Sequence, residues 1–368
     1  MGLLGLSGCG SPSSASVEMS SQTELVKTGS MELQYAENFA VDYYEDGYKM
    51  LTTLPDSKRY LLVPEGQPVP RGLDEDVSIL QEPLQNIYLV ASGVMDMFAS
   101  LDAVGQIRFS GQKQENWYIQ TAKDAMAAGD MIYAGKYSKP DYELLVSEGC
   151  DLAIENRMIT HSPEVVEMLQ SFDIPVMIEY SSYEQHPLGK VEWVKFFGAL
   201  TGKEAEAEEA FAEQTEILEK VESGEKTGKT IAFFYVTSNG LIQVRQSTDY
   251  IPKLIELAGG RYIFEDLEDS GSGRSTLNMQ VEDFYAGAKD ADILIYNSSI
   301  DGGVTTVDEL IDKCNILKDF KAVQEGQVYC TTNDMYQQSM AIGYLLQDMH
   351  TVLTDDDTAK LRYLFLLQ

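Results

Sequence analysis

The chain has 368 residues and carries 59 acidic against 27 basic side chains, a formal charge of −32. That length suits two domains, and the charge argues against a nucleic-acid partner because the phosphates would be repelled. The sequence contains no run of about 18 apolar residues, the length that a membrane-spanning helix needs.

The N-terminal segment, residues 1–30, is predicted to be the remnant of a lipoprotein signal followed by a flexible tether. Leu6-Ser7-Gly8-Cys9 is followed by the small, polar run SPSSASVEMSSQ. This resembles the bacterial lipobox, in which the cysteine is lipidated after signal cleavage. The alternative is a chance LSGC. The lipobox interpretation predicts that Cys9 attaches an exported protein to a membrane.

Alternation of apolar and polar residues begins after this segment. Met31–Met50 is rich in tyrosine and predicts a strand, a loop near Tyr43 and Tyr44, and a second strand that enters Tyr60–Gly66. We therefore expect the first domain to begin at residue 31.

A strand-helix-strand unit follows. Ile87–Gly93 is a nearly continuous apolar run of the kind that is buried in a parallel sheet. A helix is predicted through Met95–Leu101, and the next strand over residues 103–108. This spacing is typical of a βαβ unit.

Two halves of the chain repeat four elements in the same order. The first half has a helix from Asp141, the strand DLAIEN, the helix SPEVVEMLQSF and the strand IPVMIEYSS. The second half has a helix from Glu282, the strand DILIYN, the helix VDELIDKCNILKDF and the strand GQVYCTTN. Four matches in order predict two related α/β lobes.

Residues 203–223 separate these halves. KEAEAEEAFAEQTEILEKVE contains neither glycine nor proline and is built from strong helix formers with sparse apolar positions. Twenty residues at the helical rise span roughly 30 Å, enough to brace two lobes along one side. The alternative is an ordinary surface helix. We predict an N-terminal lobe over 31–202, a linker helix, and a C-terminal lobe over 224–368.

The order of these pieces resembles one known family. IYLVASGVMDMFASLDAVGQIRFSG, YELLVSEGCDLAIEN, the run from SFDIPVMIEYSS through GKEAEAE, and DYIPKLIELAGGRYIF are similar to the substrate-binding lipoproteins of ABC importers for iron-siderophores, haem and cobalamin. The resemblance covers residues 33–350 and is diffuse. It implies two Rossmann-like α/β lobes joined by one long helix, with the ligand cleft between the lobes.

Candidate ligand-binding residues follow from that fold, because ligands of open α/β sheets bind at the carboxyl ends of the strands. In the first lobe the candidates are Tyr43, Tyr44, Ser92, Met95, Trp117, Tyr118, Arg157 and Tyr183. In the second lobe they are Asn239, Gln243, Arg245, Arg274, Asn297 and Tyr336. Arginines at strand ends in so acidic a protein favour an anionic ligand, although each could instead pair with a neighbouring acid.

A partner surface is implied by the same resemblance. In the family, each lobe offers one glutamate to arginines of the membrane permease, at the start of the helix before the Asp-apolar strand. The matching positions are Glu143 and Glu282, with Asp141 and Asp283 as neighbours that could substitute. The alternative is that an early glutamate only stabilises the helix N-terminus. The expected partners are therefore an ABC permease with its ATPase, and the chain is expected to be a monomer.

No cofactor or bare-metal site is expected. The cysteines form no CxxC pair, and His161, His186 and His350 are too scattered for the histidine-rich site of a zinc importer. P-loop, GxSxG and HExxH motifs are missing from the sequence, so an enzyme is not expected.

Three alternatives stay open beside capture of an iron-siderophore. The first is haem or cobalamin binding by the same fold, since haem takes axial Tyr, His or Met ligands and the chain has 21 tyrosines. The second is a chelatase-like tetrapyrrole enzyme, which would lie in the cytoplasm. The third is a lipoprotein that senses or stores its ligand without transport.

Overall fold

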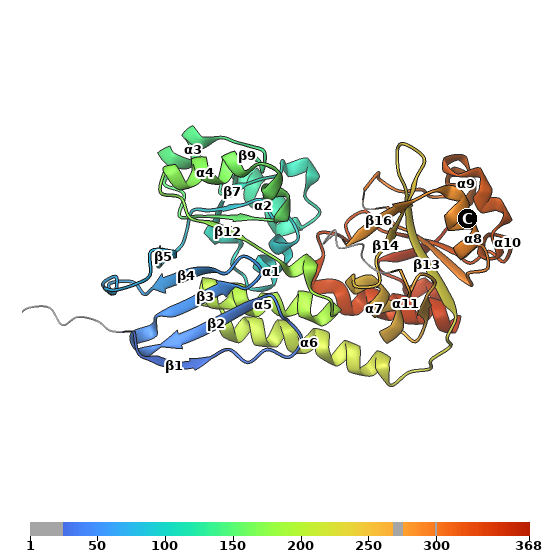
Figure 1. The fold of residues 1–368 in the computed structure, drawn as a ribbon, viewed down its shortest axis with the longest axis horizontal. Helices are drawn as coiled ribbons and strands as arrows, with labels where there is room; N and C mark the ends of the chain where they lie inside the picture. The colour runs from blue at the N-terminus through green and yellow to red at the C-terminus, as the bar shows by residue number, and fades with distance from the viewer. Residues whose placement is uncertain (1–24, 268–274, 299) are drawn as a thin grey trace, which may run out of the picture.

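The computed structural model describes residues 25–267, 275–298 and 300–368, which form two α/β lobes side by side (Figure 1). Arg274 and Cys9, both singled out from the sequence, lie outside the described residues. The two-lobe α/β architecture predicted from the repeated elements is confirmed.

A five-stranded sheet comes first in the chain, in the order β1 (Lys27–Ser30), β2 (Phe39–Tyr44), β3 (Lys49–Thr53), β4 (Lys58–Val63) and β5 (Val77–Gln81). Strands β1 to β4 are antiparallel neighbours, and β5 runs parallel to β4. The sequence did not predict this separate sheet.

Two expectations for this region were wrong. Residues 27–30, expected in the tether, form the edge strand β1. Tyr43 and Tyr44, expected in a loop, close strand β2, and the turn comes at Glu45–Gly47, where Asp46 and Gly47 have φ of 58° and 84°. Glycine adopts that left-handed backbone without steric cost, which is why the chain reverses there.

The first lobe contains a parallel sheet in the order β12 (Val176–Ile178), β11 (Leu152–Glu155), β6 (Ile87–Leu89), β7 (Ile107–Ser110) and β8 (Ile132–Tyr133). Its helices are α1 (Val94–Ser100), α2 (Gln120–Ala128), α3 (Tyr142–Ser147) and α4 (Pro163–Ser171). A short hairpin, β9 (Gly135–Lys136) and β10 (Lys139–Pro140), precedes α3. The βαβ unit predicted over residues 87–108 is confirmed, because β6 and β7 are parallel neighbours joined through α1.

Two consecutive helices lead out of the first lobe. Helix α5 (Pro187–Thr201) is buried on nearly every side, whereas α6 (Glu204–Glu222) turns only Ala207, Phe211, Gln214, Leu218 and Val221 inward. Figure 1 shows α6 running beneath both lobes. The predicted linker helix is therefore present, and one solvated face follows from its acidic sequence.

The second lobe has a mixed sheet in the order β16 (Thr276–Met279), β14 (Ile242–Arg245), β13 (Thr230–Val236), β17 (Ile293–Tyr296), β18 (Val328–Thr331) and β19 (Leu364–Leu366), with β15 (Arg261–Tyr262) beside β13. Its helices are α7 (Tyr250–Leu257), α8 (Val281–Ala288), α9 (Val307–Lys313), α10 (Lys321–Gln324) and α11 (Ile342–Thr354). The order α8, β17, α9, β18 repeats α3, β11, α4, β12, as the sequence predicted.

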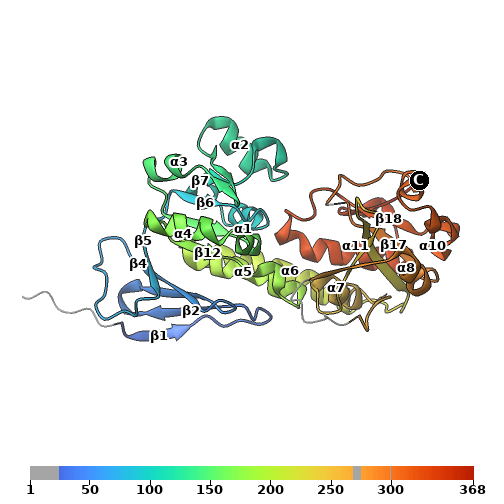
Figure 2. The ribbon, with the colours of Figure 1, turned by 45° about the horizontal axis from the view of Figure 1, so that its top comes forward.

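One apolar core joins the parts. It contains the inner face of the first sheet, α5, α1 and the inward face of α6, and it continues through α7 and α11. Figure 2 shows α5 and α6 between the N-terminal sheet and the second lobe. The lobes are therefore packed on a common helical base. Within the described part of the chain, no helix has the length and apolar character needed to cross a membrane.

Candidate functional site

A cavity of about 300 Å³ lies between the two lobes. Its walls come from the segments that follow β6, β11 and β12 in the first lobe, from α5, and from β14, the start of α7 and the segment after β18 in the second lobe. It is therefore built where strand ends of both lobes face each other, the usual position of a ligand in open α/β sheets. Its lining includes the charged, aromatic, hydroxyl and thioether side chains of Ser92, Arg157, Glu179, Tyr183, Lys190, Arg245, Asp249, Tyr250, Met335, Tyr336 and Ser339.

Among the described residues, three cations line the cavity, each from a different element. Arg157 lies in the 3-10 helix η4 (Arg157–His161) after β11, with its guanidinium 4.5 Å from the centroid of the Tyr183 ring. Lys190 lies in α5 and places its ammonium 4.7 Å from the Tyr250 ring centroid. Arg245 closes β14 and reaches Asp249 at 3.4 Å. Cations from both lobes and from the helix between them can contact one bound anion together.

Two buried acids accompany these cations. The Glu179 carboxylate accepts hydrogen bonds from the Ser181 N–H at 2.8 Å and the Ser181 hydroxyl at 2.6 Å. Asp249 accepts from the Ile251 N–H at 2.9 Å and so caps α7. Burial raises the pKa of both carboxyls, and the charge of Lys190 opposes that rise in each. With three cations against two acids among the described lining residues, this lining favours a ligand of net negative charge.

Hydroxyl groups and soft side chains complete the lining. Ser92, Tyr183 and Tyr336 face the cavity, and Met335 adds a thioether. The Ser339 hydroxyl oxygen is buried and has no hydrogen-bond partner among the described residues. A buried hydroxyl without a partner is costly, which indicates that Ser339 is available to a ligand or water at this wall.

Within the described part of the chain, no group of three or more His, Cys, Asp or Glu side chains could hold a metal ion. The chemistry of the cavity is instead that of guanidinium, ammonium, hydroxyl and aromatic groups. These groups bind oxygen atoms and planar surfaces of a ligand.

Five residues predicted from the sequence line the cavity, namely Ser92, Arg157, Tyr183, Arg245 and Tyr336. Tyr118 lies beside it, because its ring meets the Tyr336 ring edge-on with centroids 6.3 Å apart. Asn297 is buried at the end of β17, and its N–H donates to the Phe234 carbonyl, so it does not line the cavity. Asn239 is exposed at the turn between β13 and β14.

The structure places the other predicted residues elsewhere. Trp117 is in the core, where its indole N–H donates to the Ser110 hydroxyl at 3.0 Å. Tyr43 and Tyr44 lie in the N-terminal sheet, and burial, then Glu204 and Glu208 of α6, raise the pKa of Tyr43. Met95 is buried in α1, and Gln243 bonds Asn278 on the neighbouring strand.

Lys190 and Glu179 are cavity residues that the sequence interpretation missed. Lys190 was hidden in the run PLGKVEWVKFFGAL, an otherwise apolar helix. A lysine in such an apolar helix could have been noticed, because lysine is almost never fully buried unless something pairs with it. In the structure Lys190 meets the cavity, whereas the buried Lys195 of the same helix pairs with Glu192 and Glu208.

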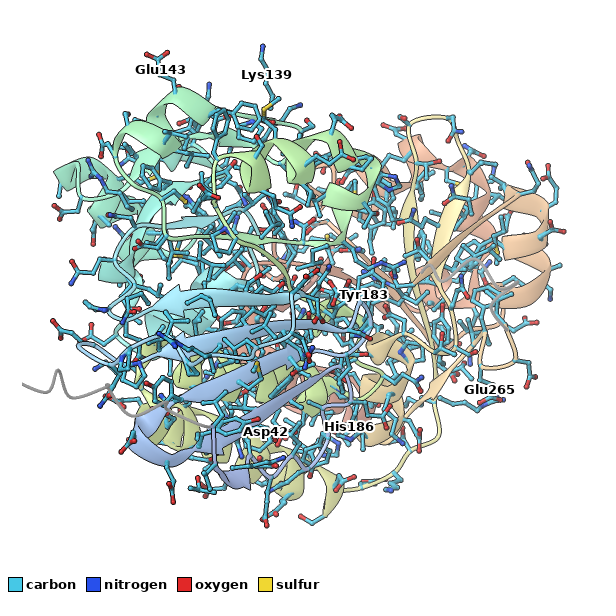
Figure 3. The ribbon with its side chains drawn as sticks, turned by 60° about the vertical axis from the view of Figure 1, so that its left-hand side comes forward. Asp42, Lys139, Glu143, Tyr183, His186 and Glu265 are labelled. Carbon is cyan, nitrogen blue, oxygen red and sulfur yellow. The ribbon has the colours of Figure 1, made fainter. Side chains whose placement is uncertain are left out.

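Glu143 and Glu282 occupy matching positions on the two lobes. Each lies in the first turn of its helix, α3 or α8, directly before the parallel strands β11 and β17. Both side chains are exposed. Figure 3 shows Glu143 projecting from the outer end of the first lobe, away from Tyr183 at the cavity.

A model of the periplasmic binding protein family matches residues 93–335, and so begins after the N-terminal sheet. A lipoprotein of Methanocaldococcus jannaschii is 25% identical over 353 residues, covering 87% of this chain and 81% of its own length. A second lipoprotein of the same organism is 24% identical over 326 residues, covering 84% of this chain and 79% of its own length.

Solved structures share the fold. A periplasmic haem-binding protein of Vibrio cholerae superimposes with a TM-score of 0.58 at 14% identity, over 73% of this chain and 98% of that chain. A protein of an Fe³⁺-hydroxamate transport system from Saccharomonospora viridis has a TM-score of 0.57 at 16% identity, over 73% and 93%. At these identities the likeness concerns the fold.

Proposed function

The chain belongs to the periplasmic binding protein family, and on that premise we propose that it is the extracytoplasmic solute-binding component of an ABC importer. Its task would be to capture a metal chelate of the iron-siderophore type and deliver it to the permease, with no bond made or broken. The haem-binding and Fe³⁺-hydroxamate proteins of the same fold support a metal chelate as the ligand class.

The observation that carries the proposal is the cavity between the lobes with its three cations. Arg157, Lys190 and Arg245 converge there in a chain whose formal charge is −32. Such a concentration of positive charge favours an anionic ligand. A ferric siderophore with carboxylate or catecholate groups meets this requirement. Haem, with its two carboxylates and a surface that tyrosines can contact, is the second choice, and cobalamin the third.

The test is a titration of the protein lacking residues 1–24 with ferrichrome, ferric enterobactin, ferric citrate, haemin and cyanocobalamin. Trp117 and Trp193 are both buried, so intrinsic fluorescence reports energy transfer to a strongly absorbing chelate, and calorimetry gives the stoichiometry. We expect one class to bind at micromolar concentration or below with one site per chain. Failure of all five would refute metal-chelate binding.

Two variants locate the bound chelate. Arg245→Met removes a cavity cation and keeps an unbranched apolar side chain, whereas Arg261→Met removes an exposed cation that pairs with Glu265 on the surface. We expect Arg245→Met to weaken binding about tenfold or more, the size expected for a lost charge-assisted contact. Arg261→Met should bind like the wild type. Equal affinity of all three proteins would place the ligand elsewhere.

We also propose that the protein delivers its ligand to the permease. Glu143 and Glu282 are exposed at matching places on the two lobes, and we assign them to contacts with permease arginines. Cys9 is the proposed lipid attachment, which the lipoproteins among its relatives support. The partners are then the permease with its ATPase, the chelate and the membrane surface, and the binding protein acts as a monomer.

A further inference from the structure

Residues 335–341 connect β18 to α11 and form one wall of the cavity. Met335, Tyr336 and Ser339 line the cavity from this segment. The segment belongs to the second lobe by sequence, yet three of its hydrogen bonds run to the first lobe. This short segment therefore lines the cavity and also contacts the first lobe.

Gln337 makes the central contact. Its side chain is fully buried, its carbonyl oxygen accepts from the Tyr118 N–H at 2.8 Å, and its amide nitrogen donates to the Asn116 carbonyl at 2.8 Å. Donor and acceptor of one carboxamide thus pair with the backbone of a single loop in the first lobe. Breaking this pair would remove both hydrogen bonds between the buried Gln337 side chain and the first lobe.

Asp96 makes the second contact. It lies in the first turn of α1, and its carboxylate accepts from the Met340 N–H at 2.7 Å. The first N–H groups of a helix lack intrahelical partners, and Met340 lies just before α11. The Gly343 N–H, in the first turn of α11, donates to the Gln214 side chain of α6 at 2.9 Å. The start of α11 is therefore held by the first lobe and by the linker helix.

Residues 335–341 approach the first lobe at a third place, beside Gly93 at the start of α1. A methyl group on Gly93 would stand 3.0 Å from the Ser339 hydroxyl and 3.7 Å from the Tyr336 carbonyl. The first distance is tighter than an ordinary van der Waals contact, so Ser339 would have to move. Glycine at this position lets the segment lie against the start of α1.

We propose that residues 335–341 are an interlobe strap, in which Gln337 and Asp96 are positioning residues that hold the cavity wall against the first lobe. The strap couples the cavity to the separation of the lobes, because a ligand that contacts Tyr336 or Ser339 acts on the segment that joins them. Its role in ligand retention rests on the proposed function, whereas its role in holding the lobes together does not.

Interlobe distance measured by pulsed electron spin resonance tests the strap without any ligand. Spin labels are attached at Ala127→Cys in α2 and Asp312→Cys in α9, both exposed, in a protein with Cys9 and Cys150 replaced by serine. We expect a narrow distance distribution in this parent. Gln337→Met, which keeps side-chain length, removes both hydrogen bonds to the first lobe and the one to the Tyr336 hydroxyl. It should broaden the distribution toward longer distances.

The matched control is Gln338→Met. Gln338 lies in the same segment and is half-buried, and its side chain makes no hydrogen bond within the described part of the chain. Thermal melting by circular dichroism verifies that each variant is folded. Gly93→Ala approaches the strap from the first lobe and should shift the distribution in the same direction, so it decides the question if Gln337→Met fails to fold. Unchanged distributions in the folded variants would overturn the strap.

Ligand retention is measured with whichever of the five chelates binds the wild type. We expect Gln337→Met to release it about tenfold faster with little change in association, since lost closed-state hydrogen bonds act mainly on dissociation. Unchanged dissociation would show that the strap does not act on the ligand. Failure of every chelate to bind would refute the proposed function and leave the distance experiment unaffected.

Discussion

Several buried carboxylates hold chain segments through backbone N–H groups. The Glu192 carboxylate on α5 accepts from the N–H groups of Gln34, Tyr35 and Ala36 at 2.8 to 3.1 Å. Glu184 accepts from Glu37, Asn38 and the Trp193 indole. On the second lobe, Asp348 of α11 accepts from Arg362, Tyr363 and Leu364. An ionised carboxylate can remain buried when several donors replace its water.

The first prediction concerns Glu192→Gln. Glutamine offers one acceptor oxygen and turns an amide toward backbone donors, so some of the three N–H groups lose their partner while Lys195, 3.7 Å away, loses a countercharge. We expect the free energy of unfolding to fall by about 2 to 4 kcal/mol, as for a broken buried charge network. Urea unfolding measures it. Glu209→Gln, on the solvated face of α6, should change little, and an equal loss in both variants would contradict the argument.

The second prediction concerns pH. Glu155, at the end of β11, is fully buried, and neither carboxyl oxygen has a hydrogen-bond partner among the described residues. Burial raises its pKa to about 8. The folded state therefore keeps a proton that the unfolded state loses near its ordinary pKa, so this group's contribution to stability falls as the pH rises from the ordinary value to about 8.

Glu155→Gln removes that titration. Between pH 4.5 and pH 7 the wild type should lose about 3 kcal/mol relative to the variant, from about 1.4 kcal/mol for each unit of pKa difference. Urea unfolding at pH 4.5, 6 and 7 measures the difference. Glu167→Gln on the exposed face of α4 serves as the control. A difference between wild type and Glu155→Gln that is independent of pH would mean that Glu155 ionises normally.

At the scale of elements, the repeated α/β pieces were predictable because each carries its signal locally. The apolar runs at β11 and β17 and the amphipathic helices before them predict type and order from their own residues. The linker helix is explained by composition alone. In these elements burial and periodicity agree, so the sequence specifies them without knowledge of their partners.

The misses involve partners distant in sequence. An alternating pattern in β2 does not reveal that five strands form a separate sheet, or that α5 covers one face of it, since strand pairing is nonlocal. Trp117 stands among polar residues, and its burial depends on the surrounding core, although the Ser110 hydroxyl that it contacts is only seven residues away. Lys190 was missed because cavity residues were sought at strand ends, whereas this one comes from a helix. The segment after β18 was singled out only at Tyr336.

The third prediction belongs to the first turns of α3 and α8. If Glu143 and Glu282 contact permease arginines, Glu143→Lys with Glu282→Lys replaces attraction by repulsion, and like charges across an interface cost several kcal/mol. We expect uptake into cells or proteoliposomes to be lost while chelate affinity stays unchanged. The control is the pair Glu209→Lys with Glu216→Lys, exposed on α6. If uptake survives in the Glu143→Lys and Glu282→Lys protein, these glutamates only stabilise the N-termini of their helices.

At the scale of the whole molecule, charge and packing are divided between surface and interior. The acids dominate the composition, and α6 displays many of them to solvent, whereas Arg157, Lys190 and Arg245 are gathered at one cavity. A single apolar core runs from the N-terminal sheet through α5 and α6 to α11. The cavity is therefore framed by lobes that share a base, which favours small changes in lobe separation over a wide hinge.

The fourth prediction follows from that shared core. The family match begins at residue 93, which would suggest that the N-terminal sheet is dispensable. Its inner face, however, packs on α5, where Phe39 meets the Trp193 and Phe196 rings at 4.9 and 5.3 Å. A chain beginning at Asn86 would expose those rings, and it would strip Glu184 and Glu192 of all five backbone donors supplied by residues 34–38. Newly exposed apolar surface costs roughly 25 cal/mol per Å², and unpaired buried carboxylates add several kcal/mol.

We expect this shortened chain to aggregate or to melt without cooperativity, while a chain beginning at Leu25 stays monomeric with one sharp transition. Light scattering after gel filtration, together with circular dichroism melting, distinguishes the two. A monomeric, cooperatively melting chain from Asn86 would make the sheet an independent module and would remove the argument for a common base.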